Sequence, residues 1–253
     1  MYLGLNLEHA EKALSELARY HALGIATKKK LPNFFNKAVK QAQVLGIDFQ
    51  QCDYLFLSTL ENFKSESCFN KYMKTIEVLF ANTLNGQKWK AIPKEPWATI
   101  THGDFWVNNL LFRKDMDGKV DDVKFVDFQT YLFNSPLKDI PYFMCGSLDE
   151  ETCEKHFDHL INFYYDRFIH TLKLMKCDIS PFTKNSFHEE LKEQALNEFP
   201  LCAATIKLFV HEVEGAPKTS GEVLSDAFTN HISDVFRNRL LRLVGIYEKK
   251  GWF

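Results

Sequence analysis

The sequence predicts a mainly helical α+β fold. Apolar residues recur at helical spacing through long stretches at both ends of the chain, whereas short strand-like runs gather between residues 98 and 126. The chain has 253 residues, of which 45% are hydrophobic and 23 are phenylalanine, so it can bury a sizeable core. This length allows one large domain or two small ones.

The first predicted helix covers residues 6–26, with Asn6 as its N-cap, because an asparagine side chain can accept a hydrogen bond from the first turn. Several residues fall near one face of this helix: Leu7, Ala10, Leu14, Leu17, Ala18 and His21. The lysines Lys28–Lys30, which stand shortly before a proline, are predicted to form a solvated connection. Further helices are predicted at residues 33–46 and 68–86.

The pattern changes after Pro93 and Pro96. Strands are predicted at residues 98–101, 110–113 and 120–126. Between the last two, Asp115-Met116-Asp117-Gly118 is the signature of a tight turn. These aspartates could instead bind calcium, but an EF-hand loop needs further oxygen ligands and a glutamate at its twelfth position, which are missing here. We therefore favour a hairpin turn.

From about residue 137 onward the sequence predicts mostly helix. The predicted helices cover residues 137–146, 150–176, 183–210 and 221–249. Breaks are expected near Pro181, Pro200 and Gly215-Ala216-Pro217, because proline interrupts the hydrogen bonding of a helix.

Charge and cysteine usage restrict the class of partner and the compartment. The net charge is −2 and the pI is about 6.5, so no global field attracts the chain to nucleic acid or to an anionic membrane. No apolar run is long enough to span a bilayer, and no signal-peptide pattern opens the sequence. The 6 cysteines stand far apart, without a C-x-x-C pair. We therefore expect a reduced, cytoplasmic setting with no nucleic-acid or membrane partner.

The stretch that carries chemistry is Thr101–Asn109, followed by Val126–Gln129. Its order is a carboxylate, then an amide, then a second carboxylate at the end of an apolar run: Asp104, Asn109 and Asp127. Phosphoryl transfer needs a base near the acceptor hydroxyl and oxygen ligands for magnesium. This order therefore predicts transfer of the γ-phosphoryl group of ATP, with Mg²⁺, to a hydroxyl group.

The specificity of this motif lies in its combination. H-G-D alone is a weak signal, but H-G-D-x-x-x-x-N followed by a hairpin and D-F agrees in two spacings and in topology. The alternative is a polar loop in which Asp104 caps a turn. We expect His102 to brace the loop through hydrogen bonds rather than to act as an acid or base, because Asp104 already fills the base position.

These residues resemble the small-molecule kinases of the protein-kinase-like superfamily, namely aminoglycoside phosphotransferases and choline kinases. The similarity is closer to the insect ecdysteroid-kinase-like group, also called the CHK kinase-like family, and it spans nearly the whole chain. The stretches that carry it are Gly4–Ala10 with Leu17–Ala22, His102–Phe112, Val126–Gln129, and Ser135–Ile140 with Tyr142-Phe143.

The resemblance implies a fold and a role for each site residue. The fold would be the C-terminal lobe of a protein-kinase-like fold over residues 1–253, with short β-hairpins around the catalytic loop. Its parts would be an initial helical segment (1–97), the catalytic and metal-binding loops (98–129) and a helical substrate-side subdomain (130–253).

Among the site residues, Asp104 would be the catalytic base, and Asn109 and Asp127 would hold the Mg²⁺ of ATP–Mg. His21 would support the catalytic loop from the first helix. Asp139 would cap or anchor the loop that follows Asp127.

The acceptor would be a small molecule with a hydroxyl group, such as an ecdysteroid-like steroid. Trp106 and Tyr131 are the candidates to contact it, since aromatic rings suit a flat apolar ligand. Other rings near the motif, which could line the pocket or fill the core, are Phe133, Tyr142 and Phe143.

No glycine-rich loop and no strand lysine precedes the first helix, so the sequence is expected to represent the C-terminal lobe without an N-lobe. It could be a fragment of a complete kinase, a short paralogue without catalysis, or a chain whose partner supplies the N-lobe. Each predicts weak ATP–Mg binding and slow turnover by this chain alone. The alternative function is a non-catalytic pseudokinase or an apolar-ligand-binding protein.

Overall fold

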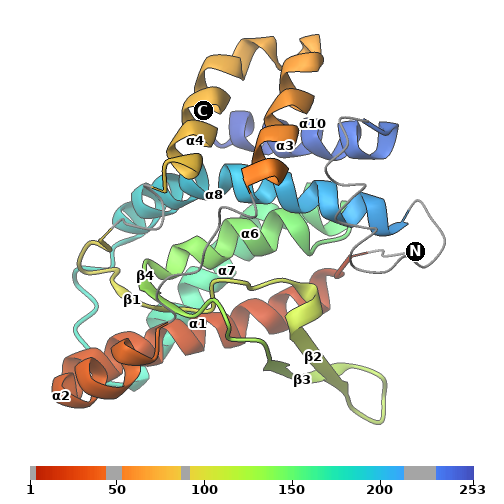
Figure 1. Ribbon diagram of the computed structural model, residues 1–253. Helices are drawn as coiled ribbons and strands as arrows, with labels where there is room; N and C mark the ends of the chain where they lie inside the picture. Colours follow the sequence, from red (N-terminus) through yellow and green to blue (C-terminus); the bar gives the residue numbers. More distant parts are fainter. Residues whose placement is uncertain (1–3, 44–52, 87–91, 214–231) are drawn as a thin grey trace. The chain divides into compact units, whose positions relative to one another are not determined.

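The computed structural model describes residues 4–43, 53–86, 92–213 and 232–253 (Figure 1). Helices dominate these residues and the strands are short and antiparallel, which confirms the predicted mainly helical α+β fold. The chain forms two compact units. The larger unit takes its residues from Leu3–Ile47 and Ile92–Gln194, and the smaller unit from Asp48–Ala91 and Ala195–Phe253. The predicted division of a single lobe at residues 97 and 129 stays a prediction.

The larger unit combines two long helices, several short helical turns and all the described strands. Its elements are α1 (Leu7–Lys30), α2 (Pro32–Phe34), the π-helix η1 (Phe35–Val39), η2 (Lys40–Ala42), β1 (Thr99–Thr101), η5 (Val107–Asn109), β2 (Leu110–Lys114), β3 (Val120–Phe125), β4 (Leu132–Asn134), η6 (Pro136–Lys138), α6 (Asp139–Gly146), α7 (Glu150–Leu174) and the beginning of α8 (Lys184–Val213).

Helix α1 begins as predicted and ends later than predicted. The Asn6 side chain accepts a hydrogen bond from the His9 N–H, which confirms Asn6 as the N-cap. Lys28–Lys30 form its last turn, so the predicted solvated connection is wrong. Cations are stabilised near the carbonyl end of a helix, and the helix stops at Leu31, directly before Pro32.

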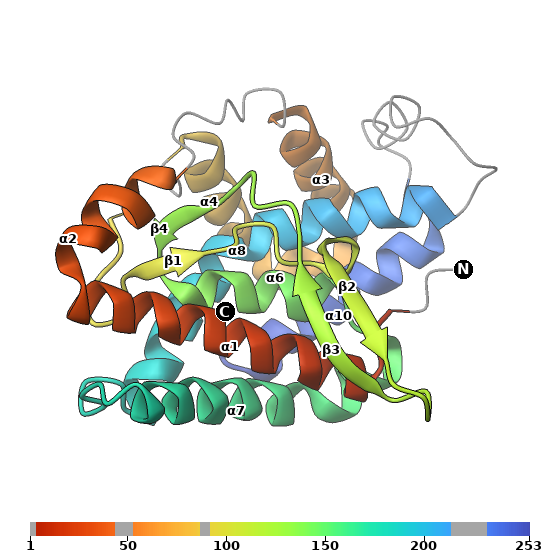
Figure 2. The same ribbon diagram turned by 90° about the horizontal axis from the view of Figure 1, so that it is seen from below.

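Helices α1 and α7 run side by side and form the base of the larger unit (Figure 2). Asp149 caps α7 by accepting a hydrogen bond from the Thr152 N–H at 2.7 Å. Residues at helical spacing on both helices are buried, among them Leu14, Leu17, Leu160 and Phe168. The two helices pack against each other through such apolar residues.

The strands form two separate pairs. β1 pairs with β4, with Ile100 opposite Phe133, and β2 pairs with β3, with Leu110 opposite Phe125. The predicted hairpin is confirmed: Asp115 Oδ1 accepts hydrogen bonds from the main-chain N–H groups of Asp117 and Lys119, both at 2.9 Å, and so closes the turn. The sequence analysis missed β4, whose 3 residues are too few to show an alternating pattern.

Strand β1 lies close to α1 because of a glycine. A Cβ atom on Gly24 would lie 2.4 Å from Thr99 Oγ1 and 2.8 Å from Ile100 Cγ1. Glycine inside a helix is unfavourable by itself, so its presence here is explained by the approach of the strand. Gly24 therefore sets the distance between α1 and the strand that leads into the site.

The smaller unit contains α3 (Asp53–Ser65), the 3-10 helix η4 (Ser67–Tyr72), α4 (Met73–Leu84), the rest of α8 and α10 (Asp234–Lys249). Phe63 lies at its centre, with ring centroids of Phe69, Phe80 and Phe199 at 4.9, 6.0 and 5.7 Å. Helix α3 was not predicted, although its buried residues Phe56, Leu60 and Phe63 stand at helical spacing. Helix α8 runs through Pro200, so the predicted break there is wrong.

Some expectations fall on other residues. The end of the predicted helix 33–46, the first part of 221–249 and the break near residues 215–217 lie outside the described residues. The cysteines that the structure describes, Cys68, Cys145, Cys153, Cys177 and Cys202, are free thiols. Within the described ranges, every helix is too short or too polar to cross a bilayer.

Candidate active site

The segment from His102 to Asn109 connects β1 to β2 and depends on a glycine. Gly103 has a φ of +82°, and a Cβ atom there would lie 2.2 Å from the main-chain oxygen of Thr130. Only glycine fits this backbone and this close approach. Thr130 Oγ1 also donates a hydrogen bond to the His102 carbonyl at 3.2 Å. The two loops of the site therefore touch at Gly103.

Asp104 and Asn109 are joined directly. The Asn109 Nδ2 group donates to the Asp104 main-chain oxygen at 2.9 Å and to Asp104 Oδ2 at 3.0 Å. The hydroxyl of Tyr142, from α6, donates to Asp104 Oδ1 at 3.1 Å. Asn109 is buried whereas Asn108 is exposed. Because Nδ2 is engaged, Oδ1 is the atom of the Asn109 amide that can serve as a metal ligand.

Asp127 follows β3 and lies beside Asn109. The Val126 N–H donates to the Asn109 carbonyl at 3.0 Å, which continues the hairpin by one pair. Asp127 has a φ of 63°, a left-handed conformation that is uncommon for a residue other than glycine and that turns the chain out of the strand. Gln129 Nε2 donates to the exposed carboxylate at 3.3 Å. The structure thus brings Asp104, Asn109 and Asp127 to one end of the β2–β3 hairpin.

His102 bridges the two loops. Its Nδ1 accepts a hydrogen bond from the Asp104 N–H at 3.3 Å, and its Nε2 donates to the Val126 carbonyl at 3.0 Å. These partners define a neutral imidazole with the proton on Nε2. The ring is buried and packs on Phe128, with centroids 4.5 Å apart. This geometry matches the bracing role expected of His102.

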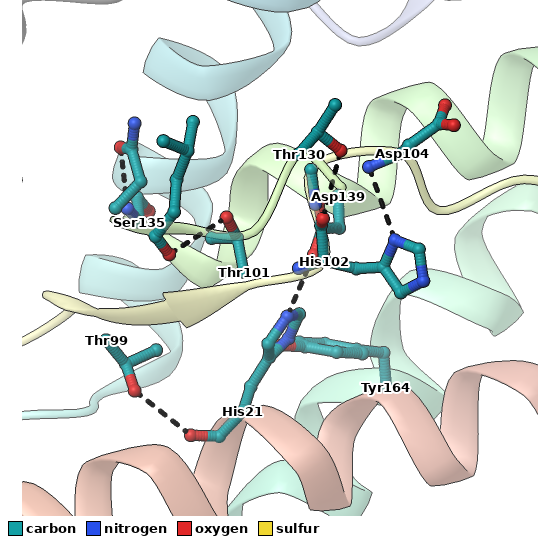
Figure 3. Close-up of polar contacts among 12 residues, drawn as sticks. His21, Thr99, Thr101, His102, Asp104, Thr130, Ser135, Asp139 and Tyr164 are labelled. Carbon is teal, nitrogen blue, oxygen red and sulfur yellow. Dashed lines mark hydrogen bonds and ion pairs between the residues drawn. The ribbon is translucent and has the colours of Figure 1, made fainter. Parts of the chain in front are cut away.

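Asp139, the first residue of α6, binds the main chain of the loop that carries Asp104 (Figure 3). Its Oδ2 accepts the His102 N–H at 2.7 Å, and its Oδ1 accepts the Gly103 N–H at 2.9 Å. The expectation that Asp139 anchors the loop after Asp127 needs correction, because the carboxylate binds the segment before Asp104. The unpredicted strand β4 explains the difference: its pairing with β1 returns the chain to the start of that segment.

His21 completes this support from α1. Its Nε2 lies 3.1 Å from Asp139 Oδ2, and its Nδ1 lies 2.8 Å from the Tyr164 hydroxyl of α7 (Figure 3). Burial lowers the pKa of His21, although the neighbouring carboxylate opposes this shift. Burial by itself raises the pKa of Asp139, but hydrogen bonds from His21 and from the loop bring that pKa below its usual value.

The protonation states follow from these directions. Asp139 is ionised and His21 is neutral near pH 7. His21 therefore donates a hydrogen bond from Nε2 to the carboxylate, and its Nδ1 accepts a hydrogen bond from the Tyr164 hydroxyl. Every polar atom of the His21 ring therefore has a partner. The network ties α1, α6 and α7 to the loop that carries Asp104.

Comparison with protein-family models shows which family the chain belongs to. The family model of the ecdysteroid kinase-like family matches residues 2–177. The chain belongs to this family. The match confirms the family that the sequence motifs indicate, and it contains every site residue described above. No curated protein is significantly similar to the chain.

Membership of the ecdysteroid kinase-like family indicates a kinase-like enzyme. The match ends at residue 177, so α8 and α10 lie beyond it. The site is built entirely from the matched part: the two loops, α1, α6 and α7.

The predicted acceptor residues of this ecdysteroid kinase-like chain lie in different surroundings. Trp106 is half-buried and precedes η5, where the Val107 N–H donates to Ser147 Oγ at 3.1 Å. Tyr131 is also half-buried, and its hydroxyl donates to the Val39 carbonyl at 2.9 Å. Contact of either ring with an acceptor stays a prediction. The sequence analysis missed the hydrogen bond from Tyr142 to Asp104. The sequence shows that Tyr142 is aromatic, but it does not show which atom its hydroxyl contacts.

The side-chain oxygens of Asn109 and Asp127 are the candidates for a sparse cation site. Within the described part of the chain, histidine, cysteine, aspartate and glutamate side chains form no group of three or more that could hold a metal. Magnesium bound with nucleotide needs less from the protein, since one or two carboxylates suffice when phosphates and water complete its shell. Asn109 Oδ1 and the Asp127 carboxylate fit that requirement.

Proposed function

We propose that this ecdysteroid kinase-like chain transfers the γ-phosphoryl group of ATP to a hydroxyl of a small apolar molecule, such as a steroid. The observation that carries the proposal is the position of Asn109. Its side chain donates to Asp104, and its carbonyl accepts from Val126, next to Asp127. One residue thus links the proposed base to the proposed second metal ligand, which supports a shared site for phosphoryl transfer.

Asp104 acts as the base. The acceptor oxygen forms a bond to the γ-phosphorus, the bond from that phosphorus to the leaving ADP oxygen breaks, and the hydroxyl proton moves to the Asp104 carboxylate. Each carboxylate oxygen offers two lone pairs, and the hydrogen bonds from Tyr142 and Asn109 use one on each. The carboxylate can therefore accept the proton while both neighbours hold it.

Asn109 and Asp127 would hold magnesium. The bound ion would offset negative charge on the phosphate oxygens. The buried Asn109 amide keeps its orientation through Asp104, and the exposed Asp127 carboxylate keeps its direction through its left-handed backbone and Gln129. Trp106 and Tyr131 remain the proposed contacts for the acceptor. The free thiols of the described cysteines support a cytosolic setting, where ATP is also present.

Thermal-shift titrations test binding of nucleotide and acceptor separately. We expect ATP with Mg²⁺ to raise the melting temperature, and Asp127→Asn to remove most of this shift. The matched control is Asp117→Asn in the exposed hairpin turn, which should keep it. A steroid panel should show no stabilisation larger than that from ATP–Mg. Stabilisation by a steroid without any effect of nucleotide would instead identify a binding protein.

Transfer of radiolabelled γ-phosphate to a panel of alcohols tests the chemistry. In a protein that also contains an N-lobe, Asp104→Asn should lower the rate by about a hundred- to ten-thousand-fold, because the base is lost, while ATP–Mg binding persists. An unchanged rate in Asp104→Asn would remove this residue from the mechanism.

A further inference from the structure

Tyr142 holds the proposed base in a way that the sequence motifs do not indicate. Its hydroxyl donates to Asp104 Oδ1 at 3.1 Å, while Asn109 Nδ2 donates to Oδ2 at 3.0 Å. Each oxygen of the carboxylate is therefore held by a different donor. Rotation about either side-chain bond of Asp104 would break at least one of these hydrogen bonds.

The position of Tyr142 in the chain strengthens this observation. Tyr142 stands three residues after Asp139 on α6, and residues at that spacing share one face of a helix. Asp139 binds the main chain of His102 and Gly103, and Tyr142 binds the side chain of Asp104. One face of α6 thus fixes both the loop and the carboxylate that it carries.

The partner of Tyr142 also separates it from tyrosines with a packing role. Buried tyrosine hydroxyls need an acceptor, and a main-chain carbonyl is sufficient. Tyr165 and Tyr247 donate to the carbonyls of residues 182 and 195. Tyr142 is 8% exposed and donates to the side chain of the proposed base instead.

We propose that Tyr142 is a positioning residue that selects the rotamer of Asp104 from which the carboxylate meets the acceptor hydroxyl. This role rests on the proposed function. Misplacement of a reacting group by about 1 Å can lower a rate by about a hundredfold, and Tyr142 prevents such misplacement. Tyr142 makes no contact with phosphate in this role, so its effect belongs to the chemical step rather than to nucleotide binding.

The test compares Tyr142→Phe with Tyr165→Phe in the full chain. Each variant removes one hydroxyl and keeps the ring. We expect three-bond couplings of the Asp104 side chain, measured by nuclear magnetic resonance at pH 7, to show one rotamer in the wild type and in Tyr165→Phe. In Tyr142→Phe they should average over several rotamers, and the ¹³Cγ signal of Asp104 should move. Unchanged couplings and an unchanged ¹³Cγ signal would overturn the proposal.

The kinetic arm separates this role from the proposed function. Tyr142→Phe should lower kcat for the alcohol by about tenfold and leave KM for ATP–Mg within about twofold. Absence of transfer by the wild type would contradict the proposed function, while the couplings would still decide whether Tyr142 sets the rotamer. If Tyr142→Phe does not fold, the wild-type Tyr142 ¹³Cζ signal in mixed H₂O and D₂O decides. Two resolved signals indicate a held hydroxyl, and one averaged signal overturns the proposal.

Discussion

His102 donates from Nε2 to the carbonyl of Val126 at 3.0 Å, and this hydrogen bond joins the two loops of the site. On the other side of the ring, Nδ1 accepts from the Asp104 N–H. A single buried side chain therefore stands between the loop of the proposed base and the residue before Asp127. Its position explains how two loops from separate strands keep a fixed spacing.

Replacing His102 should separate the two loops. His102→Ala removes both hydrogen bonds and the ring that packs on Phe128, and it leaves the Val126 carbonyl unpaired. We expect a loss of about 2–4 kcal/mol in the free energy of unfolding, measured by denaturant titration. The affinity for ATP–Mg, measured by calorimetry on the folded variant, should also decrease, because the two loops are no longer joined. Full ATP–Mg affinity in a folded His102→Ala protein would contradict the bridging role.

Gly103 should tolerate no side chain. Gly103→Ala places a Cβ atom 2.2 Å from the Thr130 main-chain oxygen in a left-handed backbone, so a loop must move. We expect a loss of more than about 3 kcal/mol in unfolding free energy. Gly118→Ala is the matched control, since Gly118 has a similar φ of +81° but open space around its Cβ position. It should cost about 1–2 kcal/mol. Equal losses in the two variants would refute the close approach.

The sequence allowed us to predict which residues form the candidate site, but not the hydrogen bonds that hold its loops in place. The spacing of Asp104, Asn109 and Asp127 follows from the chemistry of phosphoryl transfer, and the hairpin that carries them follows from a turn signature. The partner of Asp139 could not be predicted, because it depends on β4. Pairing of such a short strand is decided by distant residues rather than by local pattern.

The same limit applies to helix ends and to α3. Local rules placed the N-cap at Asn6, where one side chain decides the start of α1. They failed at Lys28–Lys30, where cations are stabilised near the carbonyl end of the helix, and at Pro200, which the helix passes through. Helix α3 was missed because the apolar run Tyr54–Leu57 obscures the helical spacing of Phe56, Leu60 and Phe63.

The buried pair of His21 and Asp139 should make the fold sensitive to acid. Because the pKa of His21 is lowered in the folded state, the unfolded state binds a proton first as the pH falls through about 6.5. Stability should therefore decrease from pH 7 towards pH 5. A further loss should follow below about pH 4, since the pKa of Asp139 is also lowered and its stabilisation disappears when it protonates.

His21→Gln isolates the first of these effects. The variant should be less stable at pH 7 by about 2–4 kcal/mol, because Asp139 and Tyr164 lose a partner. Its unfolding free energy should also change less between pH 7 and 5 than that of the wild type. His170→Gln is the control, because the His170 side chain is exposed and lies outside the network. An unaltered pH slope in His21→Gln would show that His21 does not titrate as proposed.

Lys207, in the smaller unit, should weaken the fold at neutral pH. Its side chain is 0% exposed, and its amine donates to Ser58 Oγ at 2.9 Å. Burial lowers the pKa of Lys207 to about 8 from 10.5, so the unfolded state binds more protons between these values. Stability should rise with pH over that window, because deprotonation removes the buried charge. Lys207→Met should be more stable than the wild type at pH 7 by about 1–3 kcal/mol, and its stability should not rise between pH 8 and 10.

Denaturant titrations at pH 7, 8 and 10 measure both effects. The exposed Lys124→Met is the control, and it should keep the rise; a wild type whose stability is flat across the window would contradict the prediction.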